Sequence, residues 1–503
     1  MTRTSLEHQV ADFIKEEEEI RRLLAEAAAN PREIIERALD CKGLSLPEVA
    51  ALLHVEDDET LGEMYRAANA VKLRIYGKRV VIFAPLYLSN YCVNNCTYCG
   101  YRHDNALHRR RLNPEEIAEE ARILEEMGHK RLAIECGEDP VNCPIDYVTE
   151  AMKTIYSVKE KNGSIRRLNV NIAATTVSDY RKLKEAGIGT YILFQETYHR
   201  ETYRKVHPSG PKSGYDWHTT AMDRAMEAGI DDVGVGVLFG LYDYKYEVLA
   251  MFQHALHLEE KYGVGPHTIS VPRLRPALGM QLEDFPYLVP DREFKKIIAI
   301  LRLAVPYTGM ILSTRERPEF RDELLEVGIS QISAGSCTGV GGYRREHDPV
   351  RSSRTETVSR AGSGSEASDG ETAAALEDTG SRDVGVEDAP QFVVEDHRSP
   401  DEVLRSLCRS GYIPSYCTAC YRSSRTGDRF MALAKSGQIG NVCQPNAILT
   451  FKEFLIDYAS EETRRVGEEA IRRHLELIRS PKVRQITEER LKQIEAGERD
   501  LYF

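Results

Sequence analysis

Residues 80–100 read VVIFAPLYLSNYCVNNCTYCG, an apolar run that ends shortly before three cysteines. The run is short and rich in β-branched and aromatic side chains, which favours a buried strand over a helix. Similar runs recur along the chain, separated by turns and amphipathic helical patterns. The predicted strands are residues 80–88, 131–136, 168–173, 190–195, 232–239, 267–273, 310–314 and 331–334.

The segments between these strands carry signals for helix starts and ends. Asn113, Pro114 and Glu116 supply an N-cap, a first helical proline and a capping-box acid, and Gly128 stands where that helix should end. A turn of the form Glu-x-Gly-Ile recurs at residues 185–188, 227–230 and 326–329. Eight β/α units in about 260 residues are typical of a TIM (β/α)8 barrel of the α/β class. A doubly wound open sheet has the same periodicity and remains the alternative.

The composition divides the chain into four regions. Residues 1–78 have helical patterns, and residues 79–343 hold the barrel pattern. Residues 344–395 are rich in Ser, Gly, Asp and Glu, so we predict a disordered acidic loop that cannot bury enough apolar surface to fold. Residues 396–503 regain a globular composition, with a cysteine-rich segment followed by charged helices. We predict that this last region is a helical C-terminal domain.

The overall composition excludes several classes of protein. The chain has 503 residues and a formal net charge of −12, so it lacks the basic surplus that nucleic-acid binding needs. No run of about 18 apolar residues is present, which argues against a membrane helix. The acidic start of the chain differs from a signal peptide. We therefore expect a cytoplasmic protein whose eleven cysteines are thiols or metal ligands rather than disulfides.

The first cysteine group is Cys92, Cys96 and Cys99, directly after the first predicted strand. The C-terminal ends of barrel strands are where TIM-barrel enzymes place their chemistry. Three thiolates within eight residues can hold three corners of a 4Fe–4S cube, which leaves one iron open to a small molecule. Structural zinc is the alternative, but it needs four closed ligands.

The second group is Cys417, Cys420 and Cys443 in the C-terminal region. These three cysteines again leave a cubane one ligand short, so a second iron–sulfur cluster with an open iron is one interpretation. A zinc site with Cys408 as the fourth ligand is the other. The chemistry of this cysteine group favours the iron–sulfur cluster over zinc.

The sixth predicted strand carries polar side chains at both ends. Six residues at ~3.3 Å each place His267 and Arg273 roughly 20 Å apart, at the bottom and the top of the barrel. An inward Arg273 at the mouth suits bidentate capture of a carboxylate, with Ser270 nearby on the same strand. Arg315, after the seventh strand, is another candidate. Arg273 or Arg275 could instead pair with a structural acid.

The first cysteine group on the first barrel strand resembles the radical S-adenosylmethionine (SAM) superfamily. In that superfamily SAM chelates the open iron, and its reductive cleavage gives a 5′-deoxyadenosyl radical. The resemblance implies that Tyr98 lies near the adenine and that Glu138 holds the methionine amino group. Gln195 and Glu196 close the fourth strand, and Asn171 the third, so they are candidates for contacts to ribose or substrate.

Several segments together resemble the HydG-type tyrosine lyases of FeFe-hydrogenase maturation. The resemblance implies that S-adenosyl-L-methionine and the barrel cluster cleave L-tyrosine at Cα–Cβ to p-cresol and dehydroglycine. Dehydroglycine then yields carbon monoxide and cyanide at an auxiliary iron–sulfur cluster with an extra iron, reached by His267 and by free L-cysteine. The resemblance also implies an electron donor of the ferredoxin or flavodoxin type and contact with other hydrogenase maturation proteins. The segments are residues 266–276, 415–422, 425–427, 443–447 and 499–502.

Three other functions compete with this one. A tyrosine lyase of the thiamine pathway, a 2-iminoacetate synthase, resembles the chain through the barrel but lacks the C-terminal group of three cysteines. A non-catalytic iron–sulfur scaffold would need the cysteines but neither Arg273 nor a SAM pocket. A protein stabilised by zinc is a third alternative.

Overall fold

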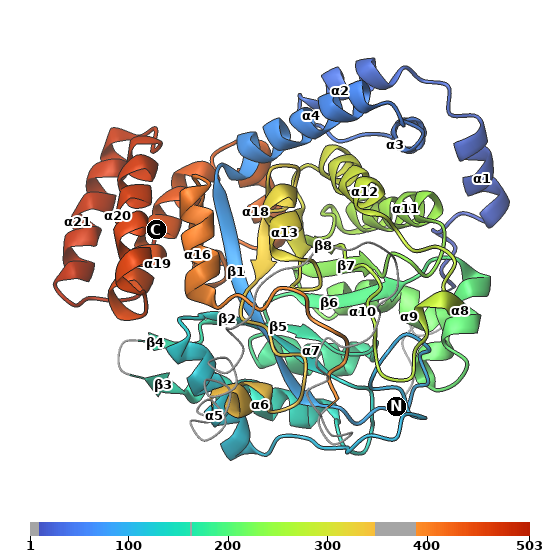
Figure 1. Cartoon of the computed structure of the whole chain (residues 1–503), viewed down its shortest axis with the longest axis horizontal. Helices are drawn as coiled ribbons and strands as arrows, with labels where there is room; N and C mark the ends of the chain where they lie inside the picture. The colour runs from blue at the N-terminus through green and yellow to red at the C-terminus, as the bar shows by residue number, and fades with distance from the viewer. Residues whose placement is uncertain (1–9, 161–162, 348–388) are drawn as a thin grey trace, which may run out of the picture.

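The computed structural model describes residues 10–160, 163–347 and 389–503. Its core is a closed barrel of eight parallel strands (Figure 1). β10 pairs with β1 and closes the sheet, so the barrel prediction is confirmed and the open doubly wound sheet is wrong. The barrel strands are β1 (Arg79–Ser89), β2 (Arg131–Cys136), β5 (Arg167–Asn171), β6 (Tyr191–Glu196), β7 (Val233–Val237), β8 (Thr268–Ser270), β9 (Gly309–Leu312) and β10 (Gln331–Ser333).

Helices surround the barrel, and their ends follow the local sequence signals. The helix that starts at Pro114 has the predicted capping box of Asn113 and Glu116. Gly187 and Gly229 take positive φ angles of 84° and 89° in their turns, whereas Gly328 does not. The helices of the barrel layer are α5 (Pro114–Glu126), α6 (Ile145–Ser157), α7 (Val177–Glu185), α8 (Arg200–Val206), α9 (Tyr215–Thr219), α10 (Ala221–Glu227), α11 (Tyr244–Tyr262), α12 (Asp291–Ala304), α13 (Pro318–Leu325) and α14 (Gly342–His347).

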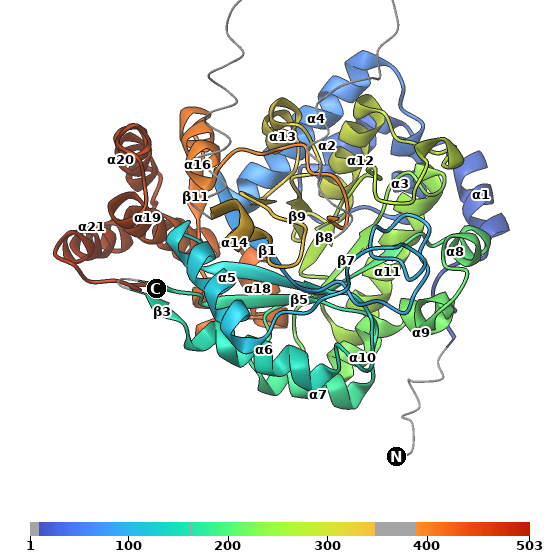
Figure 2. The ribbon, with the colours of Figure 1, turned by 60° about the horizontal axis from the view of Figure 1, so that its bottom comes forward.

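The N-terminal helices pack on one side of the barrel, against α11 and α12 (Figures 1 and 2). In the described part of the chain the first helix begins at Glu17, and residues 10–16 run along the barrel layer, where the Phe13 ring stacks on His257 at 3.9 Å between centroids. Residues 1–9 lie outside the described part. The four helices are α1 (Glu17–Ala25), α2 (Pro31–Ala38), α3 (Leu46–Leu53) and α4 (Asp58–Tyr76).

The C-terminal region is joined to the barrel by a strand that the sequence did not predict. β11 (Ile413–Ser415) pairs in parallel with the first residues of β1, below the point where β1 meets β2. This pairing fixes the cysteine-rich segment beneath the barrel. The helices of the region are α16 (Pro400–Arg409), α17 (Ala419–Arg422), α18 (Gly427–Lys435), α19 (Gly440–Asp457), α20 (Glu461–Glu476) and α21 (Pro481–Glu495).

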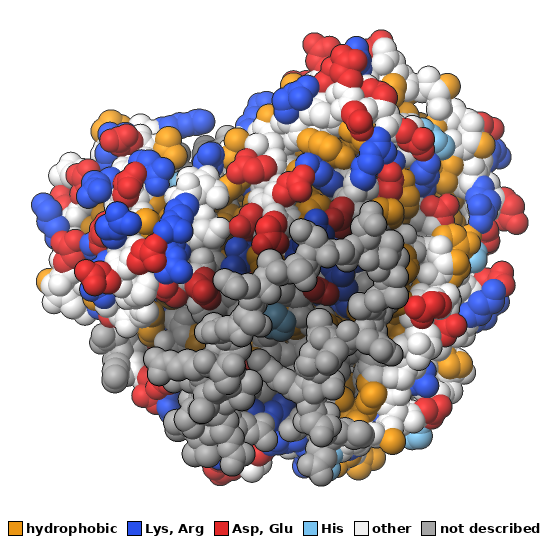
Figure 3. All heavy atoms as spheres, in the orientation of Figure 1, with side chains coloured by type: hydrophobic (Ala, Val, Ile, Leu, Met, Phe, Trp, Pro, Cys, Tyr) orange, Lys and Arg blue, Asp and Glu red, His pale blue; other side chains and the backbone are white. Residues whose placement is uncertain are grey.

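The outer C-terminal helices are held by charge pairs as well as by apolar contacts. Acidic and basic side chains alternate over α20 and α21 on the face seen in Figure 3. Lys452 on α19 pairs with Glu468 and with Glu495, both at 2.7 Å, so it links three helices. Within the described ranges, no helix is both long enough and apolar enough to cross a bilayer.

Part of the predicted acidic loop belongs to the barrel mouth. Residues 348–388 lie outside the described part, but residues 389–395 cross the top of the barrel. Gln391 donates its backbone N–H to the carbonyl of Thr338, and its own carbonyl accepts from Gly100 at 3.0 Å. The prediction of a loop that extends to residue 395 is therefore too long at this end. Outside the barrel, β3 (Lys159–Glu160) and β4 (Gly163–Ser164) form a two-stranded antiparallel sheet.

Candidate active site and second cysteine site

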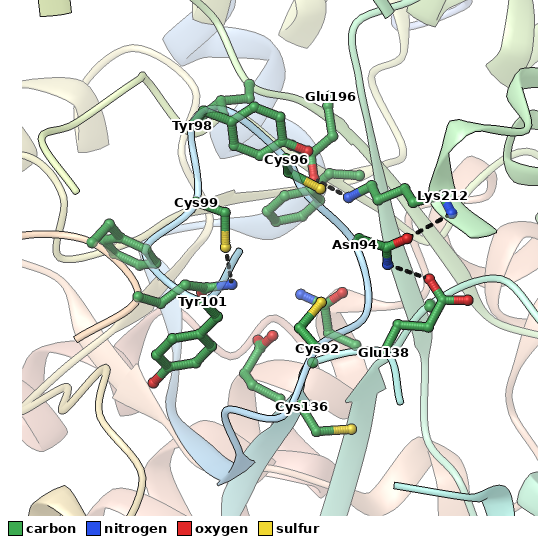
Figure 4. Close-up of a pocket in the computed structure, with 18 of the residues that line it drawn as sticks. Cys92, Asn94, Cys96, Tyr98, Cys99, Tyr101, Cys136, Glu138, Glu196 and Lys212 are labelled. Carbon is green, nitrogen blue, oxygen red and sulfur yellow. Dashed lines mark hydrogen bonds and ion pairs between the residues drawn. The ribbon is translucent and has the colours of Figure 1, made fainter. Parts of the chain in front are cut away.

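The first three cysteines line a cavity at the C-terminal ends of the barrel strands. Cys92, Cys96 and Cys99 lie in the loop after β1, and Figure 4 shows their sulfurs facing a common space. The cavity encloses about 940 Å3, including the part open to solvent. The cysteine sulfurs share this concave space with polar side chains, so a small cofactor could lie there beside a cluster.

The cysteine loop fits an iron–sulfur cube better than a single zinc ion. Within the described ranges, no three His, Cys, Asp or Glu side chains converge as a single-ion site requires. Burial raises the pKa of the Cys96 thiol and raises that of Cys99 to about 11, so a bound metal is needed to hold them as thiolates. The loop is also tightly seated, because a Cβ on Gly137 would lie 2.3 Å from the carbonyl oxygen of Tyr91.

Two linked polar pairs border this cavity (Figure 4). Asn94 donates to Glu138 at 2.5 Å, and Lys212 donates to Glu196 at 2.7 Å. The Lys212 backbone N–H also donates to Asn94 at 2.9 Å. Burial alone would lower the pKa of Lys212, but its interactions with nearby groups, of which the attraction to the Glu196 carboxylate is the largest, together outweigh burial. The pKa of Lys212 is therefore raised. The ammonium group therefore stays charged, and it balances the acids around the cavity.

A second cavity continues from the first into the barrel. It encloses about 700 Å3, including open solvent, and it is lined by Ser270 on β8 and by Ser313 after β9. Six residues line both cavities: Glu135, Asn171, Phe194, Arg315, Gln391 and Phe392. A molecule held in the second cavity would therefore lie next to one held in the first.

Most of the predicted site residues line these cavities, but Gln195 does not. Tyr98, Glu138, Asn171, Glu196, Ser270 and Arg315 all do. The Gln195 side chain points the other way, into the helix layer, and donates to Thr219 on α9 at 2.9 Å. Strand alternation explains this, because Phe194 and Glu196 occupy the inner face of β6. The predicted contact of Gln195 with ribose or substrate is therefore wrong.

Arg273 is also placed differently from the prediction. Its guanidinium is buried outside the barrel interior, where it pairs with Glu316 and, at 2.8 Å, with Asp291. It also lies over the rings of Phe294 on α12 and Phe320 on α13. Arg273 lines neither cavity, so the guanidinium groups at the mouth are those of Arg275 and Arg315.

The second group of cysteines lies at the opposite end of the barrel, where Cys417 and Cys420 follow β11 and Cys443 lies on α19. Burial raises the pKa of Cys417. A hydrogen bond with the Cys420 thiol and, to a smaller extent, the charges of nearby arginines lower the pKa of Cys443 to about 6. Arg131, the first residue of β2, donates to the Cys417 carbonyl at 2.9 Å.

Buried cations lie at this end of the barrel. Arg79, Arg131 and Arg167 are the first residues of adjacent strands β1, β2 and β5, and all three are at most 6% exposed. Two of them, Arg131 and Arg167, have an Nε with no partner. Buried positive charge needs a compensating anion, and thiolates bound to a cluster supply one. The donor set therefore fits an anionic metal site.

His267 points toward this lower site. It immediately precedes β8 at the bottom of the barrel, as predicted, and its Nε2 lies 3.1 Å from the Tyr421 hydroxyl, next to Cys420 in the chain. Its Nδ1 lies 3.5 Å from the carboxylate of Asp232. A carboxylate on one ring nitrogen leaves the other free to bind a metal.

The barrel, the open three-cysteine site and the adjoining cavity define the class of enzyme. Residues 86–255 match the model of the Radical SAM superfamily, and residues 270–413 match that of the Biotin and Thiamin Synthesis associated domain. The chain is a radical SAM protein. Within that class it belongs to the HydG family of FeFe-hydrogenase maturases, because it matches solved HydG structures along nearly its whole length.

Two solved structures and one curated relative show the extent of the similarity. A crystal structure of HydG, a maturase of the FeFe-hydrogenase, is 61% identical, with a TM-score of 0.88, and the match covers 98% of this chain and 100% of that one. HydG from Carboxydothermus hydrogenoformans is 38% identical, with a TM-score of 0.77 and coverage of 96% and 100%. The 2-iminoacetate synthase of Escherichia coli is 33% identical over 62% of this chain and 81% of its own.

Proposed function

We propose that this protein is a radical SAM lyase that cleaves L-tyrosine at Cα–Cβ to p-cresol and dehydroglycine for assembly of the FeFe-hydrogenase active site. The observation that carries the proposal is the presence of two three-cysteine sites at opposite ends of one barrel, with two adjoining cavities beside the upper site. The extent of the HydG match favours this function over the thiamine-pathway lyase, because the 2-iminoacetate synthase match spans 62% of the chain and the HydG match 98%.

At the upper site, Cys92, Cys96 and Cys99 would hold a 4Fe–4S cluster with SAM on its open iron. When bound and reduced, this pair supplies a 5′-deoxyadenosyl radical. Glu138 would accept a hydrogen bond from the amino group of the methionine moiety, and Asn94 would orient the Glu138 carboxylate. Tyr98 would lie beside the adenine, its hydroxyl fixed by His207 at 2.8 Å.

The second cavity would hold tyrosine. Arg315 lines this cavity, and its guanidinium carbon lies 3.3 Å from the centroid of the Phe392 ring. Stacking on that ring fixes the plane of the guanidinium. A fixed guanidinium can bind the substrate carboxylate with two parallel hydrogen bonds. Ser270, Asn171 and Glu196 would complete the polar contacts.

At the lower site, Cys417, Cys420 and Cys443 would hold an auxiliary iron–sulfur cluster. His267 would bind an extra iron through Nε2, with free L-cysteine as a further ligand. There dehydroglycine would be converted to carbon monoxide and cyanide, which leave bound to iron. A ferredoxin or flavodoxin would donate electrons, and other hydrogenase maturation proteins would accept the product.

The activity is tested with anaerobically reconstituted protein, SAM, a low-potential reductant and tyrosine. We expect both p-cresol and 5′-deoxyadenosine, measured by chromatography, and p-cresol should disappear when tyrosine is omitted. Electron paramagnetic resonance of the reduced protein should show two clusters, only one of which responds to SAM. Absence of both products from protein with intact clusters would contradict the lyase.

His267→Ala should remove one iron per chain while leaving the sulfide content unchanged. The physical reason is that the imidazole would hold a single iron outside the cube, whereas the cysteines hold the cube itself. The measurement is iron and acid-labile sulfide per chain after reconstitution. His474→Ala is the matched control, because His474 is a buried imidazole of the C-terminal region that bonds Gln444 and Gly411 instead. Equal iron in the wild type and both variants would rule out His267 as a ligand.

A further inference from the structure

Glu135 is a carboxyl group inside the barrel to which neither cysteine site gives a role. It lines both cavities and so stands where they meet. On β2 it shares the inner face with Arg131 and Ala133, in alternation. Its cross-strand neighbours are Tyr87 on β1 and Asn171 on β5.

Glu135 differs from the other acids of the cavity in its partners. Glu138 accepts a short hydrogen bond from an amide, and Glu196 pairs with the ammonium of Lys212. Glu135 accepts a hydrogen bond from Asn171, and no ion pair involves it within the described ranges. Burial raises its pKa to about 8, so it can exchange a proton near neutral pH.

Arg315 supplies the opposite charge in the same space. It too lines both cavities, and no acid of the described ranges pairs with its guanidinium. Glu135 and Arg315 thus offer one carboxyl and one cation to a shared ligand. An amino acid is a zwitterion, and its carboxylate belongs on the guanidinium. That orientation leaves the ammonium group for Glu135.

Building on the proposed tyrosine cleavage, we propose that Glu135 binds the α-ammonium group of the substrate and accepts one proton from its nitrogen. The ammonium nitrogen has no free electron pair, whereas the nitrogen of dehydroglycine is double-bonded to Cα. Breaking one N–H bond heterolytically leaves the electron pair on nitrogen and puts the proton on the Glu135 carboxylate. This step is a proton transfer in which no atom is oxidised or reduced, so it needs no oxidant or reductant.

The recognition step is tested by equilibrium binding to the SAM-loaded holoenzyme. The ligands are L-tyrosine and 3-(4-hydroxyphenyl)propionate, which lacks the amino group. Glu135→Gln should bind tyrosine about tenfold more weakly, because a hydrogen bond between charged groups is lost, and bind the propionate like wild type. Glu120→Gln is the matched control, since Glu120 is a buried acid on α5 that accepts from backbone N–H groups of Tyr343 and Arg344.

The proton transfer is tested by the pH dependence of single-turnover p-cresol formation at saturating tyrosine. The wild-type rate should rise with pH as the carboxyl ionises, and this rise should be absent in Glu135→Gln and return in Glu135→Asp. Equal weakening for both ligands, or an unchanged pH profile in Glu135→Gln, would overturn the proposal. A wild type that binds tyrosine but forms no p-cresol would instead refute the lyase function, and the two binding curves would still decide the role of Glu135.

Discussion

Replacement of both Cys417 and Cys420 by alanine should leave p-cresol formation near the wild-type rate and abolish carbon monoxide. The reason is spatial: these thiols follow β11 and lie at the N-terminal ends of the barrel strands, whereas tyrosine and SAM would occupy the C-terminal ends. The measurement is a parallel assay of p-cresol by chromatography and of carbon monoxide by its binding to a haem protein.

The Cys408→Ala variant is the control for this double replacement. Cys408 is a fully buried thiol on α16, and burial raises its pKa to about 12. Its removal should change neither product, because we assign it no metal. If carbon monoxide persisted without Cys417 and Cys420, the role of the lower site would be wrong. If Cys408→Ala lost metal, the lower site would have a fourth protein ligand, and the open-iron interpretation would fail.

The sequence was sufficient for the barrel because its strands and turns are local features. Each barrel strand is a short apolar run, and Gly187 and Gly229 adopt the left-handed turn that their sequence pattern indicates. β11 was missed because it has only three residues, one of them Pro414, which ordinarily argues against a strand. It becomes a strand only through its pairing with β1, and that long-range contact leaves no local pattern.

The cysteines were predictable from their spacing, but their polar neighbours were not. Lys212 lies in a 3-10 turn, and its contact with Asn94 joins positions 118 residues apart in the sequence. Glu135 could have been found, since alternation along residues 131–136 places it on the same face as Arg131. The prediction for Arg273 failed because β8 ends at Ser270, so the alternation rule no longer applies three residues later.

Arg273→Ala should destabilise the fold, whereas Arg315→Gln should weaken tyrosine binding with little change in stability. Removing Arg273 leaves Glu316, which is 1% exposed at its side chain, with Arg275 at 2.8 Å as its one remaining cationic partner among the described residues. Loss of one of the two cationic partners of this buried carboxylate should cost about 1–3 kcal/mol. Removing the Arg315 guanidinium breaks no ion pair of the described ranges, but it deletes the proposed carboxylate contact, worth about 2–5 kcal/mol of binding.

Denaturant unfolding and tyrosine binding, measured on the same preparations, separate the two arginines. Arg273→Ala should unfold at lower denaturant and bind tyrosine normally in its folded fraction. Arg315→Gln should unfold like wild type and lose roughly 30-fold or more in affinity. Arg315→Lys should recover only part of that affinity, because an ammonium cannot make two parallel bonds to a carboxylate. The reverse result, with binding lost in Arg273→Ala and retained in Arg315→Gln, would place the substrate carboxylate outside the cavity that Arg315 lines.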